Sequence, residues 1–185
     1  MFVRFAAATG MRRGEIVALR WSNVNLDEEF VQVAEAAVRV REIGQIISET
    51  KSETSNRRIW LDEGTVILLR THRAQQNEYM LSLGELYTNH DFVFANLHGN
   101  MLDLDHISQS FKRIAVKAGL PNSRLHDLRH FSASVLMANG ANPVVVKERM
   151  GHSSAAFTLS RYGHGFEADH RAAAKSIGDL FTVNG

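Results

Sequence analysis

One stretch of the chain, residues 30–61, differs from its surroundings, because apolar and polar residues alternate there with the period of two that is typical of β-strands. Alternation occurs at 31–33 and again at 38–40, Gly44 marks a turn, and 58–61 closes the stretch. These signals predict a small antiparallel sheet of about three strands. The segments on both sides have helical composition, so the sequence predicts a mainly α fold with a small antiparallel β-sheet, an α+β class.

The helices that follow the sheet are marked most clearly by their ends. Gly119-Leu120-Pro121 ends a helix over 106–118, because glycine fits the left-handed position after a helix and proline cannot continue it. Gly140 stops a helix over 126–139, and Asn142-Pro143 supplies the cap and the first residue of a helix that ends at Gly151. The other expected elements are an opening helix through residue 21, a long helix over 64–83, a short strand at 92–94 and an amphipathic helix over 166–181.

Size and composition limit the class of protein. With 185 residues, 44% of them hydrophobic, the chain suits one domain with a continuous core. The absence of cysteine excludes a disulfide framework and a thiolate zinc site, and no apolar run is long enough to span a bilayer. We therefore expect a soluble cytoplasmic protein with no membrane partner. The net charge of +1 gives little support for a nucleic-acid partner, although cations gather near 12–20, 51–58 and 112–124.

The residues that carry chemistry gather late in the chain. The segment 126–130 reads His-Asp-Leu-Arg-His, and His152 and Tyr162 follow it. On a helix, residues three and four apart share a face, so His126 and Arg129 project together. Guanidinium groups match the non-bridging oxygens of a phosphodiester, and a phenol can attack its phosphorus. This set of residues is equipped to cleave a DNA strand without a metal.

Two earlier segments complete a family pattern. Thr-Gly-Met-Arg ends at Arg12 and Lys51 lies between Thr50 and Ser52, and with the later motifs they resemble the catalytic domain of the tyrosine recombinases, the phage integrase family. The resemblance covers nearly the entire chain. It implies a site-specific DNA recombinase that cleaves and rejoins strands through a 3′-phosphotyrosyl intermediate, with no metal, ATP or other cofactor. It also implies that 1–185 is one catalytic domain and that the helical DNA-gripping domain of full-length members is absent, as in a fragment.

The resemblance assigns a role to each matching position. Arg12 and Arg129 occupy its arginine positions and hold the scissile phosphate, while Arg13 is a rival to Arg12 that periodicity cannot separate from its neighbour. His152 is implied to donate a hydrogen bond to the phosphate. Tyr162 is implied to be the nucleophile, because it follows His152 at the family's distance.

The remaining candidates follow from their chemistry. His126 can hydrogen-bond a phosphate oxygen or handle the tyrosine proton, and His130 is expected to be structural. Lys51, in a polar hairpin tip, is the candidate general acid for the 5′-oxygen. Arg57 and Arg58 are poor acids, and we expect them to contact backbone phosphates.

Several alternatives stay open. His126 and His130, four residues apart, also fit a metal-binding helix face, but position 127 is Asp rather than the Glu of the zinc-protease motif. A topoisomerase of type IB would use similar chemistry, and a degraded or accessory prophage remnant would bind DNA without recombination. The expected partners are double-stranded DNA, in the cytoplasm at the nucleoid, and other recombinase protomers, through the helix at 166–181 or with that helix packed on its own chain.

Overall fold

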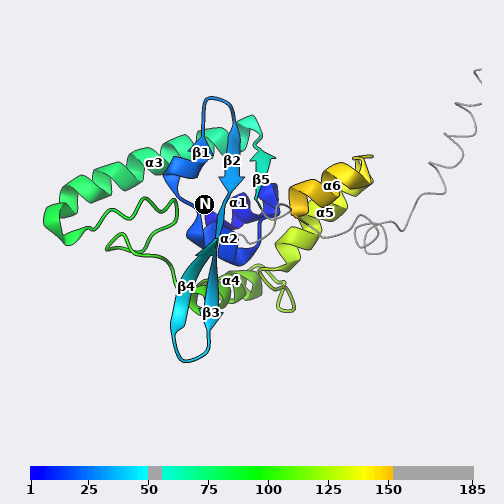
Figure 1. Cartoon of the computed structure of the whole chain (residues 1–185). Helices are drawn as coiled ribbons and strands as arrows, with labels where there is room; N and C mark the ends of the chain where they lie inside the picture. Colours follow the sequence, from blue (N-terminus) through cyan, green and yellow to red (C-terminus); the bar gives the residue numbers. More distant parts are fainter. Residues whose placement is uncertain (50–55, 152–185) are drawn as a thin grey trace, which may run out of the picture.

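The computed structural model describes residues 1–49 and 56–151, which form a mainly helical fold with two small sheets (Figure 1). In chain order the elements are α1 (Phe2–Thr9), α2 (Arg13–Ala18), the 3-10 turn η1 (Trp21–Asn23), β1 (Val24–Asn25), β2 (Phe30–Val33), β3 (Glu35–Val40), β4 (Gly44–Glu49), β5 (Arg57–Trp60), α3 (Glu63–Leu83), the 3-10 turn η2 (Gly84–Leu86), α4 (Leu104–Lys117), α5 (Asp127–Ala138) and α6 (Pro143–Met150). The predicted fold class is confirmed.

The strands form two antiparallel sheets. β2 lies between β1 and β5, with Val33 opposite Arg57, whereas β3 and β4 form a separate hairpin with Val38 opposite Ile46. The sequence predicted a single sheet, and this was wrong. The chain leaves β2 at Ala34, so β3 pairs only with β4, and the hairpin extends away from the other strands (Figure 1).

The first helix is shorter than the sequence predicted. Gly10 has a φ of 65°, a left-handed conformation that ends α1, and Arg12 is extended before α2 begins. The expected opening helix is therefore two helices separated by a turn. The strand expected at 92–94 is reduced to an isolated bridge between Arg20 and Phe92.

The predicted helix ends are confirmed in the second half of the chain. The Asn142 side chain accepts a hydrogen bond from the Val144 amide and so caps α6, and Gly151 follows that helix in a left-handed conformation with a φ of 64°. Gly119 and Gly140 likewise take positive φ values after α4 and α5. None of the helices in the part of the chain that the structure describes is long and apolar enough to cross a membrane.

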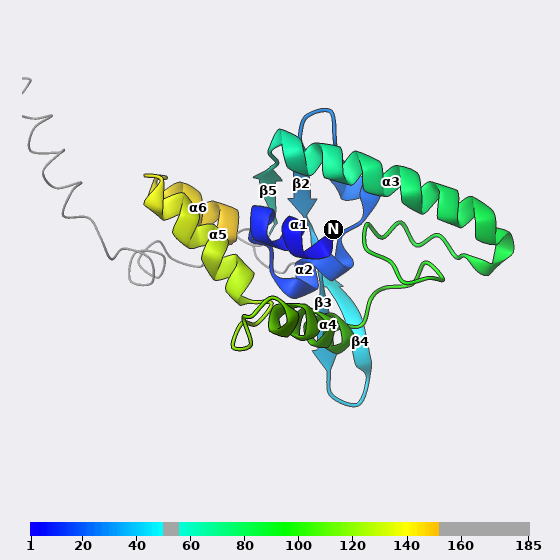
Figure 2. The same cartoon turned by 180° about the vertical axis from the view of Figure 1, so that it is seen from behind.

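The core is divided between a main body and the α5–α6 pair. Phe5, Ile16, Val31 and Ile59 are fully buried in the main cluster, which joins α1 and α2 to the three-stranded sheet and to α3. A second cluster holds α5 against α6 through Ala133, Met137, Val146 and Met150. Both views show α3 and the α5–α6 pair extending to opposite sides of this body (Figures 1 and 2). α1 packs against α5. Hydrogen bonds of Arg12 and Arg129 bring together the end of α1, the start of α2 and the end of α6.

Gly14 allows α2 to lie close to β3. A Cβ atom at this position would come 2.3 Å from the backbone carbonyl oxygen of Ala37. We predict that Gly14→Ala lowers the free energy of unfolding by about 1–3 kcal/mol, because the added methyl overpacks a backbone contact. The measurement is chemical denaturation followed by circular dichroism. Alanine is ordinarily the better helix former by about 1 kcal/mol, so an equally stable or more stable variant would contradict the close contact.

Candidate active site

Arg12 is positioned by the turn between α1 and α2. Its backbone amide donates to Oε2 of Glu15 at 2.7 Å, and its Nη1 donates to Oε1 of the same carboxylate at 2.8 Å. Its Nη2 donates to the carbonyl oxygen of Gly151, 2.6 Å away and just beyond α6. The Arg12 side chain is nevertheless 42% exposed. Its guanidinium is therefore held at a fixed place and still offers a surface to an anion.

Glu15 is the anionic centre of the site. Its side chain is 2% exposed, and Arg57 donates to it through Nη1 at 3.0 Å and Nη2 at 2.9 Å. Burial raises the pKa of Glu15, but the hydrogen bonds and charges of Arg57 and Arg12 outweigh that effect and hold the pKa below its ordinary value. The carboxylate is thus ionised and shared between two arginines.

Arg129 reaches the same place from α5. Its Nη1 donates to the carbonyl oxygen of Gly10 at 2.7 Å, and its Nη2 donates to the carbonyl oxygen of Met150. The residue is 5% exposed. Arg129 therefore ties the end of α1 to the end of α6, and its charge lies in a protected environment where electrostatic interactions are strong.

Three consecutive carbonyls at the end of α6 each accept a hydrogen bond from an arginine. The carbonyl oxygen of Arg149 accepts from Nε of Arg57 at 2.8 Å. The carbonyl oxygen of Met150 accepts from Arg129, and that of Gly151 accepts from Arg12. The last carbonyls of a helix lack partners within the helix and carry partial negative charge. The arginines come from β5, from α5 and from the turn before α2, so the end of α6 gathers cations from three parts of the chain.

This geometry separates Arg12 from its neighbour Arg13. Arg13 donates to the Leu104 carbonyl at 3.0 Å and to the Ser108 hydroxyl, so its side chain points to α4. Arg12 and Arg129 instead bind adjacent carbonyls at the end of α6. The structure thus brings together the two arginines that the resemblance selected.

His126 lies at the start of α5, one residue before the helix begins, and its ring makes an edge contact with that of His130 at 4.8 Å between centroids. Partial burial lowers the pKa of His126, and the nearby charges of His130 and Arg129 lower it further. A neutral imidazole at this helix start is suited to accept a proton. His126 also lines a cavity of about 470 Å³ with Arg13 of α2, Lys112 of α4 and Arg124 of the loop before α5.

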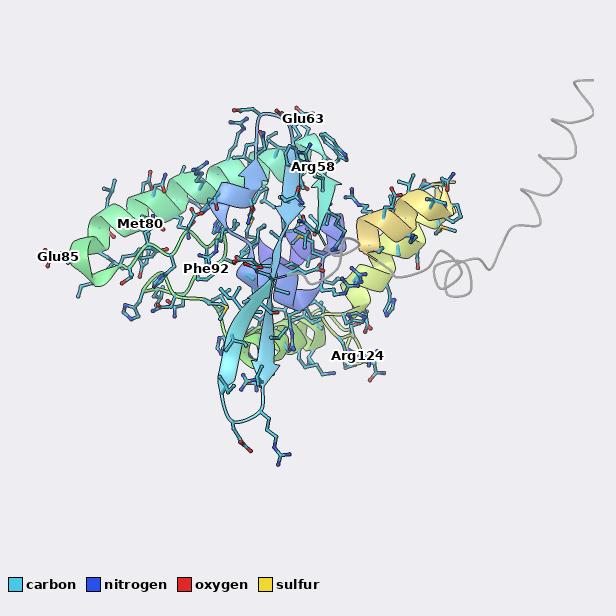
Figure 3. The ribbon with its side chains drawn as sticks, in the orientation of Figure 1. Arg58, Glu63, Met80, Glu85, Phe92 and Arg124 are labelled. Atoms are coloured by element: carbon cyan, nitrogen blue, oxygen red, sulfur yellow. The ribbon has the colours of Figure 1, made fainter. Side chains whose placement is uncertain are left out.

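One of the basic residues near the site differs from expectation. Arg57 is 8% exposed and bound to Glu15, so the expectation that it contacts backbone phosphates is wrong. Arg58, its neighbour on β5, is exposed and lies over the Phe30 ring at 4.6 Å (Figure 3). Arg124, labelled in Figure 3, lies in the loop before α5 and pairs with Asp127 at 3.3 Å.

Sequence reasoning missed Glu15 and the burial of Arg57. The sequence did contain a signal for Glu15, which lies three residues after Arg12, the N-cap of α2. A Glu at that position often accepts a hydrogen bond from the backbone amide of the N-cap residue. Nothing in the local sequence separates the buried Arg57 from the exposed Arg58.

Three expected site residues, Lys51, His152 and Tyr162, lie outside the described residues. Within 1–49 and 56–151, no group of three or more His, Cys, Asp or Glu side chains could hold a metal ion. The His126 and His130 pair therefore has no third ligand in that part of the chain.

The fold is similar to those of two solved DNA-recombining proteins. The Tn1549 transposon integrase, solved with transposon right end DNA, matches with a TM-score of 0.79 at 20% identity over 96% of this chain and 58% of its own. The XerA recombinase matches with a TM-score of 0.67 at 22% identity over 92% of this chain and 55% of its own.

Sequence comparison gives the family directly. The model of the phage integrase family matches residues 1–168, and the chain belongs to this family. Its relatives include a XerC-like tyrosine recombinase of Caldanaerobacter subterraneus subsp. tengcongensis, 28% identical over 95% of this chain and 48% of the relative. The ICEBs1 integrase of Bacillus subtilis is 28% identical over 97% and 48%. The chain thus spans about half the length of these curated relatives.

The pKa of His126 is open to direct measurement. In a ¹H–¹³C NMR titration we predict a midpoint below the ordinary value of 6.5. At a pH between 6.5, the ordinary pKa, and the lower pKa of His126 in the folded chain, the unfolded chain binds more protons than the folded chain. The contribution of His126 to the free energy of unfolding is therefore lost as the pH falls from 6.5 through the folded pKa. His130→Gln should raise the midpoint, because it removes a neighbouring positive charge, while the same change at the exposed His98 should not. An unmoved midpoint in His130→Gln would contradict the proposed coupling.

Proposed function

We propose that this chain, over residues 1–185, is the catalytic domain of a site-specific DNA recombinase. Tyr162 attacks the scissile phosphate, forms a 3′-phosphotyrosyl link and frees a 5′-hydroxyl; a 5′-hydroxyl from another strand then reverses the step. The observation that carries the proposal is the meeting of Arg12 and Arg129 on the adjacent carbonyls of Gly151 and Met150. Gly151 directly precedes His152 in the sequence, so the two arginines bind the backbone next to a third position of the family's catalytic pattern.

The two arginines supply electrostatic stabilisation. Attack on a phosphodiester develops charge on its non-bridging oxygens, and a guanidinium fixed in advance stabilises that charge without reorganising during the reaction. Arg12 is the more exposed of the two, and Arg129, largely buried on the adjacent carbonyl, binds the same phosphate and adds a second positive charge. A phenol beside these cations is a better nucleophile, because they favour its phenolate.

Two proton transfers and one further phosphate contact fall to three other residues. His126 is a neutral imidazole at the start of the helix that carries Arg129, so it can accept the Tyr162 proton or bind a phosphate oxygen. His152 donates a hydrogen bond to the phosphate. Lys51 protonates the departing 5′-oxygen, since an alkoxide is a poor leaving group.

The proposed partners are double-stranded DNA and other protomers bound to it. Family membership and the fold shared with the Tn1549 integrase, a protein solved in complex with transposon DNA, support the DNA partner. Protomers are proposed to meet through residues 166–181.

Strand cleavage can be trapped with a suicide substrate, a duplex nicked so that the released fragment diffuses away. We predict a covalent protein–DNA adduct with the wild-type chain that forms equally well in EDTA and is absent with Tyr162→Phe. Gel electrophoresis under denaturing conditions measures it. Arg12→Gln should reduce adduct formation by about 10²–10³-fold, because it removes one preorganised positive charge, and a melting curve checks that the variant is folded at the assay temperature.

Each outcome separates the alternatives. An adduct that persists in Tyr162→Phe, or full activity in Arg12→Gln, would overturn the assigned roles. Loss of cleavage in EDTA alone would favour metal-assisted chemistry. Relaxation of supercoiled plasmid with no sequence requirement would identify a topoisomerase of type IB, and DNA binding with no adduct would identify a remnant without catalysis.

A further inference from the structure

Glu15 lies beside the proposed phosphate-binding arginine and carries the opposite charge. Its Oε1 accepts from Nη1 of Arg12 at 2.8 Å and from Nη1 of Arg57 at 3.0 Å. Its Oε2 accepts from the Arg12 amide at 2.7 Å and from Nη2 of Arg57 at 2.9 Å. One buried carboxylate is thus shared between an exposed guanidinium and a buried one.

The charges of this cluster have a consequence for phosphate binding. Glu15 and Arg12 alone would form a neutral pair, and a neutral pair attracts a phosphodiester weakly. Arg57 adds a second positive charge, so the three side chains together carry a net charge of +1. Because Arg57 is 8% exposed and the Arg12 side chain is 42% exposed, the accessible member of the cluster is Arg12.

We propose that Arg57 is a positioning residue that neutralises Glu15, so that Arg12 keeps its positive charge for the scissile phosphate. The inference rests on the proposed function, and it deepens that function by adding a residue that acts through another. Glu15 fixes the direction of the Arg12 side chain, and Arg57 removes the electrostatic cost of having that carboxylate beside the phosphate site.

Arg57 also links β5 to α6. Its Nε donates to the Arg149 carbonyl at 2.8 Å, and the Arg149 side chain donates in return to the Trp60 carbonyl at the end of β5, at 2.9 Å. A second bond from Arg149, at 3.0 Å, reaches the Ala8 carbonyl in α1. If Arg57 had only a structural role, that role would be to hold β5 to α6 through these hydrogen bonds. Loss of the hydrogen bonds must therefore be distinguished from loss of the positive charge of Arg57.

The charge and the link respond differently to a second substitution. We predict that Arg57→Gln lowers adduct formation on the suicide substrate by about tenfold or more, because Arg12 is then paired with an uncompensated carboxylate. Adding Glu15→Gln removes that carboxylate and leaves Arg12 as the charged member, so the double variant should recover most of the lost rate. If Arg57 were only a structural link, the double variant would be as impaired as Arg57→Gln or more so, and the proposal would fail.

A matched control and a folding check accompany these variants. Arg70 on α3 also binds a carboxylate, Asp27 at 2.9 Å, and a backbone carbonyl, that of Leu26, but it does not bind Glu15. Arg70→Gln should leave adduct formation within about twofold of wild type, as is usual for an exposed ion pair. Melting curves of all variants, measured at the assay temperature and above, identify any that fail to fold; an Arg57→Gln loss that the Arg70→Gln control reproduces would overturn the proposal.

A second measurement does not depend on cleavage. Glu15 can be followed by ¹³C NMR of its side-chain carboxyl, and Arg57→Gln should raise its pKa, because burial then acts with one cation fewer to oppose it. An unchanged pKa would overturn the inference even if the wild-type chain cleaves DNA. Conversely, if Arg57→Gln raised the pKa of Glu15 but the wild-type chain formed no covalent adduct with DNA, the proposed function would be wrong and the pairing of Arg57 with Glu15 would be supported.

Discussion

The end of α6 presents backbone carbonyls that need donors, and the fold meets this need with arginines. The carbonyls of Arg149, Met150 and Gly151 accept from Arg57, Arg129 and Arg12 in turn. A buried carbonyl without a partner costs free energy, and a buried guanidinium without acceptors costs more. The α5–α6 pair, which has its own small core, is therefore joined to the main body by the same contacts that gather the cations.

Folding alone places the two arginines of the candidate site. Arg12 and Arg129 are held by backbone groups before any ligand arrives, so a phosphate would meet guanidinium groups already in place. Preorganised charge of this kind is a large contribution to catalysis in enzymes that stabilise developing anions. Glu15 serves the same end, because its buried carboxylate sets the direction of Arg12 while Arg57 balances its charge.

Much of the fold could be predicted because its signals are local. Gly119-Leu120-Pro121, Gly140 and Asn142-Pro143 mark helix ends through backbone geometry that acts over a few residues, and α4, α5 and α6 begin and end close to the predicted positions. The split of the sheet could not be predicted, because the alternation of 30–40 does not specify whether β3 pairs with β2 or only with β4. The break at Gly10 was missed, although a glycine after a helical run is the same signal that predicted the helix ends at Gly119 and Gly140.

A family pattern allows site residues to be proposed from the sequence, whereas contacts that depend on the tertiary structure cannot be predicted from it. The pattern favoured Arg12 over Arg13, and the turn after α1 directs them to different partners, α6 and α4 respectively. The partnership of Arg57 with Glu15 depends on how β5 lies against α2 and α6, which the sequence around either residue does not reveal. Lys51, His152 and Tyr162 stay predictions from the sequence.

The central claim is that Arg12 and Arg129 bind one phosphate together while the end of α6 holds them. A crystal structure of the Tyr162→Phe chain bound to a nicked duplex would test it most directly. The account predicts one backbone phosphate in contact with both guanidinium groups, which keep their bonds to Gly151 and Met150. A scissile phosphate that is bound by neither arginine, or by one while the other stays buried and remote, would contradict it.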